Sequence, residues 1–201
     1  MKKIIFVVGT TLLMFIFNGL GLAAEKVKYP APEVLVLGET TNDQVIELFG
    51  KPKNKPVSEE TKDGILLRLY YIESGNMYKG FLPMRQLGFY FKDNVLIGYD
   101  WFSSFKDDSS DYDDTKIDLI KKGETTWEQV IELMNCKYGI YTYPKTDDPD
   151  DRALVYTYSH YEVLVGFKTK TNVYTKVLMV VCDKDGIVKD VETALNGEKN
   201  W

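Results

Sequence analysis

An internal repeat constrains the fold of this chain more than any other feature of its sequence. Residues 38–48 read Gly-Glu-Thr-Thr-Asn-Asp-Gln-Val-Ile-Glu-Leu, and residues 123–133 read Gly-Glu-Thr-Thr-Trp-Glu-Gln-Val-Ile-Glu-Leu. Nine of the eleven positions are identical, at a constant offset of 85 residues. Self-similarity of this kind indicates that one supersecondary unit occurs twice. We therefore expect two related units in tandem.

The repeated segment has the pattern of a capped helix. Thr41 and Thr126 occupy N-cap positions, and Gln44 and Gln129 follow three residues later, which is the spacing of a capping box. Apolar residues then recur at i, i+3 and i+4, which predicts one apolar stripe per helix: Val45, Leu48 and Phe49, then Val130, Leu133 and Met134. Capping explains the shared polar residues, so we assign them no catalytic role.

The predicted helices end at equivalent positions. Gly50, followed by Pro52, ends the first, and Asn135 stands at the corresponding place in the second. Strand-forming segments follow each helix, and the turns at 92–94 and 184–186 predict hairpins. The expected strands cover residues 65–72, 87–91 and 95–101 in the first unit, and 153–158, 161–167, 175–182 and 187–193 in the second.

The predicted fold class is α+β with two tandem units. Each unit is an N-terminal helical segment packed on a three- to four-stranded antiparallel sheet. The first unit covers residues 33–106 and the second residues 118–195. Residues 107–117 are polar and strongly acidic at their start, which favours an exposed acidic linker.

The first residues predict export. Lys2 and Lys3 precede an apolar run from Ile4 to Phe17, and small residues lead to Ala24 before the first acidic residue. This is the layout of a secretory signal peptide covering residues 1–24, and it predicts a periplasmic or secreted protein. A single membrane anchor is the alternative, in which case only the uncleaved segment contacts the membrane. No cysteine follows the apolar run, so no lipid anchor is expected.

Charge narrows the class of partner. Residues 1–24 hold two lysines and no acid, so cleavage leaves 23 basic against 30 acidic residues, a formal charge of −7. An acidic surface repels phosphates, and we expect no nucleic-acid partner. The two cysteines, Cys136 and Cys182, are compatible with one disulfide in an exported chain. Two buried free thiols are the alternative.

Few residues carry the patterns of catalytic chemistry or metal binding. His160 is the single histidine, lies between tyrosines and is expected to be a surface or turn residue rather than a catalytic one. The acidic stretches 107–114 and 147–151 lack the Asp-x-Asp-x-Asp-Gly pattern of a calcium loop. We therefore predict no metal, no cofactor and no enzymatic activity.

Aromatic content is the stronger indication of function. The chain has 27 aromatic residues, 14 of them Tyr. If one sheet face packs on helices, the other exposes aromatic rings, which supply contact energy at interfaces at low entropic cost. The alternative is that the rings fill the core between the units. The candidate docking residues are Tyr70, Tyr90, Tyr99, Trp101, Tyr156 and Tyr158.

The opening of the first unit resembles the SmpA/OmlA family, also called BamE-like. The residues that carry this resemblance are Gly38, Thr40, Val45, Phe49 (shifted by one position), Gly50 and Pro52. Residues 33–101 resemble one such domain and 118–195 a second, which lacks the Gly-x-Pro helix end. A duplicated version is similar to the β-lactamase inhibitor proteins. The resemblance implies a periplasmic binding scaffold that assists outer-membrane assembly or inhibits an enzyme.

Together these observations predict an exported, non-catalytic protein of the cell envelope that docks a protein partner on an aromatic-rich sheet face. The competing prediction is an envelope enzyme or a small-ligand-binding protein that uses a cleft between the two units.

Overall fold

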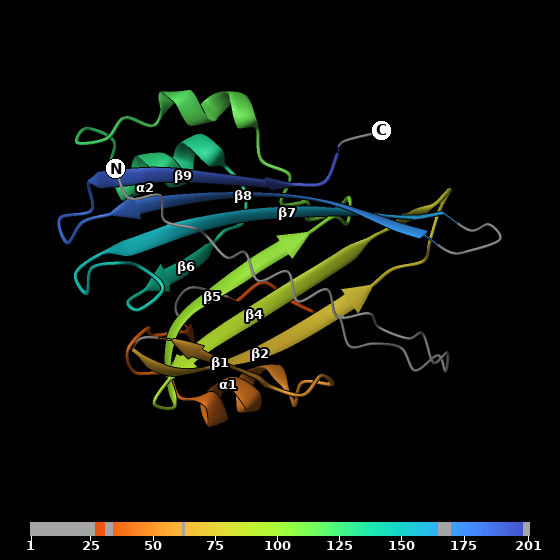
Figure 1. Cartoon of the computed structure of the whole chain (residues 1–201), viewed down its shortest axis with the longest axis horizontal. Coiled ribbons are helices and arrows are strands. Elements are labelled where there is room, and N and C mark those ends of the chain that lie inside the picture. Colours follow the sequence, from red (N-terminus) through yellow and green to blue (C-terminus); the bar gives the residue numbers. More distant parts are fainter. Residues whose placement is uncertain (1–26, 31–33, 62, 165–169, 199–201) are drawn as a thin grey trace.

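The strands of the computed structural model form one antiparallel sheet. The structure describes residues 27–30, 34–61, 63–164 and 170–198, and within them nine strands share this sheet. The order is β1-β2-β4-β5-β6-β7-β8-β9, with β3 paired to β7 (Figure 1). The strands are β1 (Val57–Thr61), β2 (Gly64–Ser74), β3 (Phe81–Leu82), β4 (Met84–Lys92), β5 (Val95–Ser103), β6 (Gly139–Thr142), β7 (Arg152–Leu164), β8 (Lys170–Cys182) and β9 (Val188–Asn196).

This single curled sheet contradicts the predicted fold class of two helix-on-sheet units. The last strand of the first repeat, β5, pairs with the first strand of the second, β6, through Gly98↔Tyr141 and Tyr99↔Ile140. An unpaired strand edge leaves backbone donors and acceptors without partners, and joining β5 to β6 covers one edge of each repeat. The expectation of two units was wrong because pairing between repeats merges their sheets.

Two short helices, α1 (Asn42–Phe49) and α2 (Trp127–Met134), start and end as the sequence predicts. In each, the N-cap threonine accepts a hydrogen bond from the backbone N–H of the glutamine three residues later, at 3.3 Å. The glutamine Oε1 accepts in return from the threonine N–H, at 2.8 Å for Thr41 and 2.9 Å for Thr126. Both capping boxes are therefore confirmed, and the C-caps are Gly50 and Asn135.

The shared Gly-Glu-Thr-Thr segment also anchors each helix to the last strand of its repeat. Gly38 N–H donates to Leu96 O at 2.8 Å, and Leu96 N–H donates to Thr40 O at 2.8 Å. Gly123, Thr125 and Val188 form the equivalent pair of bonds in the second repeat. Positive φ angles of 85° at Gly38 and 77° at Gly123 set the turns, a conformation that glycine adopts without steric cost.

Both helices pack on the same face of the sheet. One row of paired residues on that face runs Leu69, Phe89, Tyr99, Ile140, Leu154, Val180 and Val191. The first three pack in one cluster with Val45 of α1, and Leu154 and Val180 pack in another with Val130 of α2. The helices lie at opposite ends of the sheet (Figure 1), so two adjoining helix-face cores replace one shared core.

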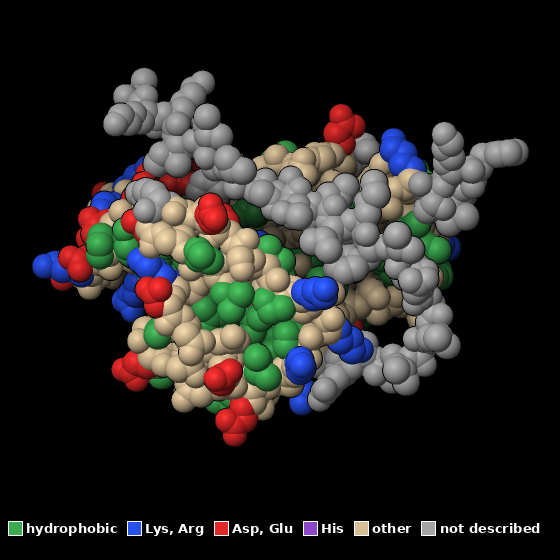
Figure 2. All heavy atoms as spheres, turned by 60° about the horizontal axis from the view of Figure 1, so that its bottom comes forward, with side chains coloured by type: hydrophobic (Ala, Val, Ile, Leu, Met, Phe, Trp, Pro, Cys, Tyr) green, Lys and Arg blue, Asp and Glu red, His purple; other side chains and the backbone are tan. Residues whose placement is uncertain are grey.

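The predicted apolar stripe needs one correction. In α2, Val130 and Met134 are buried and Leu133 packs against the cluster. In α1, Val45 is buried, but Leu48 is 49% exposed, and Ile46 packs against the core with Phe49 instead. Hydrophobic side chains gather at the surface of this end of the molecule, with Lys and Arg side chains beside them (Figure 2).

Residues 107–117 do not form a free linker, although most of their carboxylates are exposed. Ser110 is fully buried; its hydroxyl donates to Thr157 O on β7 at 2.6 Å and accepts from Ser103 N–H on β5 at 2.9 Å. Asp108 pairs with the buried Arg85 at 3.4 Å, and a short 3-10 helix, η2 (Asp114–Leu119), follows. The segment therefore connects β5 to β7 by hydrogen bonds at the end of these strands that the short strand β6 does not reach.

Two other expectations concern the N-terminal segment and the strands of the second repeat. The predicted signal peptide, residues 1–24, lies outside the described residues. Within the described ranges, no helix has the length and apolar character needed to cross a membrane. In the second repeat, two strands are expected at 153–158 and 161–167; residues 153–164 instead belong to one continuous strand, β7, which passes through Ser159 and His160, and residues 165–167 lie outside the described residues.

Candidate functional site

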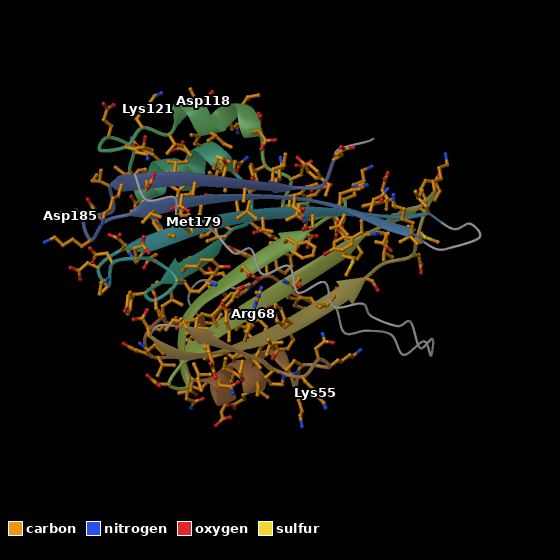
Figure 3. All side chains as sticks on the ribbon, viewed as in Figure 1. Lys55, Arg68, Asp118, Lys121, Met179 and Asp185 are labelled. Atoms are coloured by element: carbon orange, nitrogen blue, oxygen red, sulfur yellow. The ribbon has the colours of Figure 1, made fainter. Side chains whose placement is uncertain are left out.

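The face of the sheet opposite the helices, here called the helix-free face, carries a cluster of polar and aromatic side chains. One row of paired residues on it runs Arg68, Tyr90, Gly98, Tyr141, Ala153 and Val181, from β2 to β8. Paired residues in neighbouring strands point to the same face. Figure 3 places Arg68 and Met179, another residue of this face, between the ends that carry α1 and α2.

Asp100 is the centre of the polar cluster. Its Oδ2 accepts hydrogen bonds from the hydroxyls of Tyr90 and of Tyr141, the latter at 3.0 Å. Arg68 Nη2 donates to the same oxygen at 3.4 Å. Tyr90 and Tyr141 come from different repeats, so the site requires the joined sheet. Burying a carboxylate costs free energy unless the group is paired with a cation and hydrogen-bonded. The two hydroxyls and the guanidinium provide both the hydrogen bonds and the charge pairing.

Two cations lie against the aromatic rings of the cluster. Arg68 Cζ is 4.1 Å from the centre of the Tyr70 ring and 4.6 Å from that of Tyr90. Lys145, from the loop after β6, places its Nζ 4.5 Å from the centre of the Tyr90 ring and 4.9 Å from that of Tyr141. The negative faces of the rings stabilise both charges. The result is a compact cluster of alternating cations and aromatic rings, in which Tyr90 and Tyr141 are buried and the side chains of Arg68, Tyr70 and Lys145 are partly exposed.

Two glycines make room for these side chains. A Cβ atom at Gly88 would lie 2.5 Å from Asp100 Oδ1. A Cβ at Gly98 would lie 2.7 Å from Ile140 O and 3.0 Å from the Tyr141 ring. Glycine in a strand interior weakens the strand but permits a close approach. The sequence therefore has glycine where the Asp100 carboxylate and the Tyr141 ring cross the sheet.

Burial sets the protonation states in this cluster. It raises the pKa of Tyr90 and of Tyr141 well above the ordinary value, and the nearby Asp100 carboxylate raises both further. Burial also lowers the pKa of the Lys145 ammonium. At neutral pH the two tyrosine hydroxyls stay protonated and donate to Asp100. The arrangement fixes the rings and the charges in place and does not activate a nucleophile.

The six predicted docking residues lie in different surroundings. Tyr90 belongs to the cluster on the helix-free face, and half-buried Tyr70 covers Arg68. Tyr99, Trp101 and Tyr156 are buried in the helix-face cores, and Tyr158 is buried near Lys176. The structure thus brings Tyr70 and Tyr90 together, but Tyr90 is only 2% exposed, so five of the six predicted docking rings are buried and Tyr70 alone is partly exposed.

A β-bulge explains part of this difference. Alternation along β5 predicts that Val95, Ile97, Tyr99 and Trp101 share a face. The register shifts between Tyr90 and Phe91, so Ile97 packs on the helix-free face while Tyr99 and Trp101 pack with α1. An extra residue of this kind inverts the facing of one part of a strand.

Sequence reasoning missed Arg68, Asp100, Tyr141 and Lys145. Two of them carried a usable signal. Arg68 interrupts the apolar run 65–72, and Asp100 stands between two aromatic residues in β5. A charged residue within such a strand needs a partner if it is buried. Lys145 comes from a loop, and local pattern gives no reason to place it on the sheet.

The predicted disulfide is not formed. Cys136 and Cys182 are free thiols that pack in the same helix-face cluster, Cys182 fully buried and Cys136 at its edge. As small apolar side chains they fill this core without a bond. Burial raises the pKa of both thiols to about 11, so they are protonated and weakly reactive at neutral pH.

His160 and the acidic stretches 107–114 and 147–151 make contacts that hold the fold together. His160 was expected at the surface or in a turn, and this expectation is wrong: the residue lies within β7, and its ring is buried and stacks on Phe81 with ring centres 4.5 Å apart. The acidic side chains pair with cations of the same chain: Asp111 and Asp114 with Lys176, and Asp148 and Asp151 with Lys189. In the part of the chain that the structure describes, no group of three or more His, Cys, Asp or Glu side chains is arranged for a metal ion.

Comparison with known proteins adds no family: no family model matches the chain, and no curated protein matches its sequence.

Proposed function

We propose that this protein is an exported, non-catalytic binding protein of the cell envelope that docks a protein partner on its helix-free face. The observation that carries this proposal is the Arg68–Tyr90–Asp100–Tyr141 cluster. It places fixed charges and aromatic rings on the sheet face that no helix of the described residues covers, with Arg68, Tyr70 and Lys145 partly exposed above the buried Tyr90 and Tyr141. Tyrosine and arginine are the residue types that dominate binding energy at protein interfaces.

The protonation states of the cluster favour binding over catalysis. A general acid or base works best with a pKa near the operating pH. Tyr90 and Tyr141 have raised pKa values and are committed to Asp100 by hydrogen bonds. Rigid, hydrogen-bonded side chains lose little entropy when a partner binds, which increases affinity. The resemblance of the repeated motif to envelope binding scaffolds agrees with this role.

Site-specific photocrosslinking in cells of the source organism tests the proposal. A photoreactive phenylalanine analogue replaces Tyr70, which borders the cluster, or Leu48, an exposed residue on α1. We expect a discrete protein adduct from position 70 and none from position 48. Adducts from position 48 alone, or from neither position, would contradict docking on the helix-free face.

A further inference from the structure

We propose that the docking surface recognises an acidic side chain of its protein partner, whose carboxylate pairs with Lys145 and with the exposed edge of Arg68. This inference rests on the proposed function and specifies the chemistry of the partner. Its basis is the imbalance of charge in the cluster. Arg68 and Lys145 both lie against the Tyr90 ring, whereas the cluster itself contains one carboxylate, Asp100.

The hydrogen bonds of Asp100 leave the cations incompletely paired. Asp100 Oδ2 is already used by both tyrosine hydroxyls, and its contact with Arg68 is 3.4 Å long. Arg68 Nε is buried and has no hydrogen-bond partner. Lys145 lies over two ring faces, and among the described residues it has no carboxylate at ion-pair distance. Burial lowers the pKa of Lys145 and outweighs the Asp100 carboxylate, which acts on Lys145 through space and raises this pKa, and Glu59 on β1, which does so more weakly.

A carboxylate from a partner would therefore meet cations whose hydration is already reduced. The desolvation of a charge is the main cost of forming a buried ion pair. Here Lys145 already lies 4.5 Å and 4.9 Å from the centres of the Tyr90 and Tyr141 rings, so the chain bears part of that cost in the unbound state, and burial lowers the Lys145 pKa accordingly. Attraction is also stronger in such surroundings than in water. The Arg68 side chain is 25% exposed, so a partner group reaches its edge.

The rest of the molecule favours selectivity for this position. The chain as a whole is acidic, so an acidic partner is repelled by most of its surface and attracted where cations are concentrated. The lysines at 51, 53 and 55 form a second basic segment, after α1, but their side chains are exposed. Exposed charges are hydrated and screened, and their pairing contributes little.

Fluorescence anisotropy with labelled peptides tests the inference on the mature protein. The probes are an oligoglutamate peptide and an oligoglutamine peptide of equal length. We expect the glutamate peptide to bind and the glutamine peptide not to bind. Lys145→Gln should weaken binding by about tenfold or more, because it removes a partly buried partner charge. Lys145→Arg keeps the cation but changes its shape at a stacked site, so it should lose less affinity than Lys145→Gln without matching the unmodified protein.

Lys55→Gln is the matched control, since it removes the same charge from the exposed segment at the α1 end (Figure 3). We expect its effect to stay below about twofold. The inference is overturned if Lys145→Gln binds like the unmodified protein, or if Lys55→Gln loses as much affinity. Equal unfolding midpoints of the variants, measured in parallel, establish that the comparison concerns binding and not folding.

Combined with photocrosslinking, this experiment separates the two proposals. A Tyr70 adduct that forms equally well in the Lys145→Gln background would refute the carboxylate site and leave the protein-binding function standing. Peptide binding that depends on Lys145, with no adduct at position 70, would support the carboxylate site and contradict the docking of a protein partner on the helix-free face.

Discussion

Gly98 on β5 lies directly opposite Tyr141 on β6, at the junction of the two repeats. The absence of a side chain at Gly98 lets the Tyr141 ring lie over β5, and its hydroxyl reaches Asp100 Oδ2 at 3.0 Å. Asp100 belongs to the first repeat and Tyr141 to the second. The junction therefore does two things: it merges the sheets, and it assembles the candidate site from both copies of the repeat.

The packing of Asp100 against Gly88 gives a direct test of this geometry. The three atoms nearest to a Cβ at position 88 all belong to the Asp100 side chain, the closest at 2.5 Å. Gly88→Ala should therefore displace the carboxylate from Tyr90 and Tyr141, with a loss of about 1–3 kcal/mol in the free energy of unfolding. Urea denaturation of the purified protein measures this loss.

A double-mutant cycle supplies the control for that prediction. Asp100→Ala removes the atoms that the new methyl group would meet. Gly88→Ala should then cost less than about 0.5 kcal/mol in the Asp100→Ala background, so the two changes couple strongly. Additive effects of the two substitutions would show that the carboxylate does not lie against residue 88.

Local features of this fold could be predicted from the sequence. The caps at Thr41 and Thr126 depend on contacts within three residues, and the repeated motif shows them twice. The hairpin turn at Asp93 and Asn94 likewise has the positive φ angles, 51° and 68°, that its residue types indicate. Such features are set by neighbours in the chain, and pattern reasoning detects them.

Features that depend on distant pairing could not be predicted. The β5–β6 pairing joins residues about 40 positions apart, and no local pattern specifies which strand edges meet. Arg85 shows the same limit. Arg85 is 2% exposed because Glu73, Asp107 and Asp108 surround it. An arginine whose partners cannot be identified from the sequence is expected at the surface. For the same reason the sequence predicts an exposed acidic linker here, whereas Asp107 and Asp108 pair with Arg85.

Two buried tyrosines should respond differently to loss of the hydroxyl. The Tyr156 hydroxyl is buried without a hydrogen-bond partner, so Tyr156→Phe should leave the free energy of unfolding unchanged or increase it by up to about 1 kcal/mol. The Tyr90 hydroxyl donates to Asp100, so Tyr90→Phe should cost about 1–3 kcal/mol. Thermal and urea unfolding of both variants measure the difference. An equal loss in both would mean that Tyr156 has a partner.

The two N-caps should contribute equally to stability. Thr41→Ala and Thr126→Ala each remove an acceptor for a backbone N–H of the first helical turn. We expect each to lower the free energy of unfolding by about 1 kcal/mol. Thr41→Ser and Thr126→Ser keep the hydroxyl and serve as controls with little loss. If the serine variants were as unstable as the alanine variants, the capping hydrogen bond would not be the cause.

The free thiols should make the protein less stable at alkaline pH. Burial raises the pKa of Cys136 from 9.0 to about 11, so the unfolded chain loses this proton first. Below pH 9 the thiol is protonated in both states and the free energy of unfolding is at its full value. As the pH rises from 9 toward 11, deprotonation of Cys136 in the unfolded chain lowers the free energy of unfolding by about 2 kcal/mol. Tyrosines with raised pKa values add a loss that begins near pH 10.

Cys136→Ser isolates the contribution of Cys136, because it keeps all of the tyrosines and Cys182, whose pKa is also raised to about 11. Its free energy of unfolding should fall less steeply between pH 9 and 11 than that of the unmodified protein, in urea titrations at fixed salt. Thiol titration of the unreduced, denatured protein is the accompanying check and should find both cysteines free. If no thiol titrates, Cys136 and Cys182 are bonded, and the alkaline loss assigned to Cys136 has another origin.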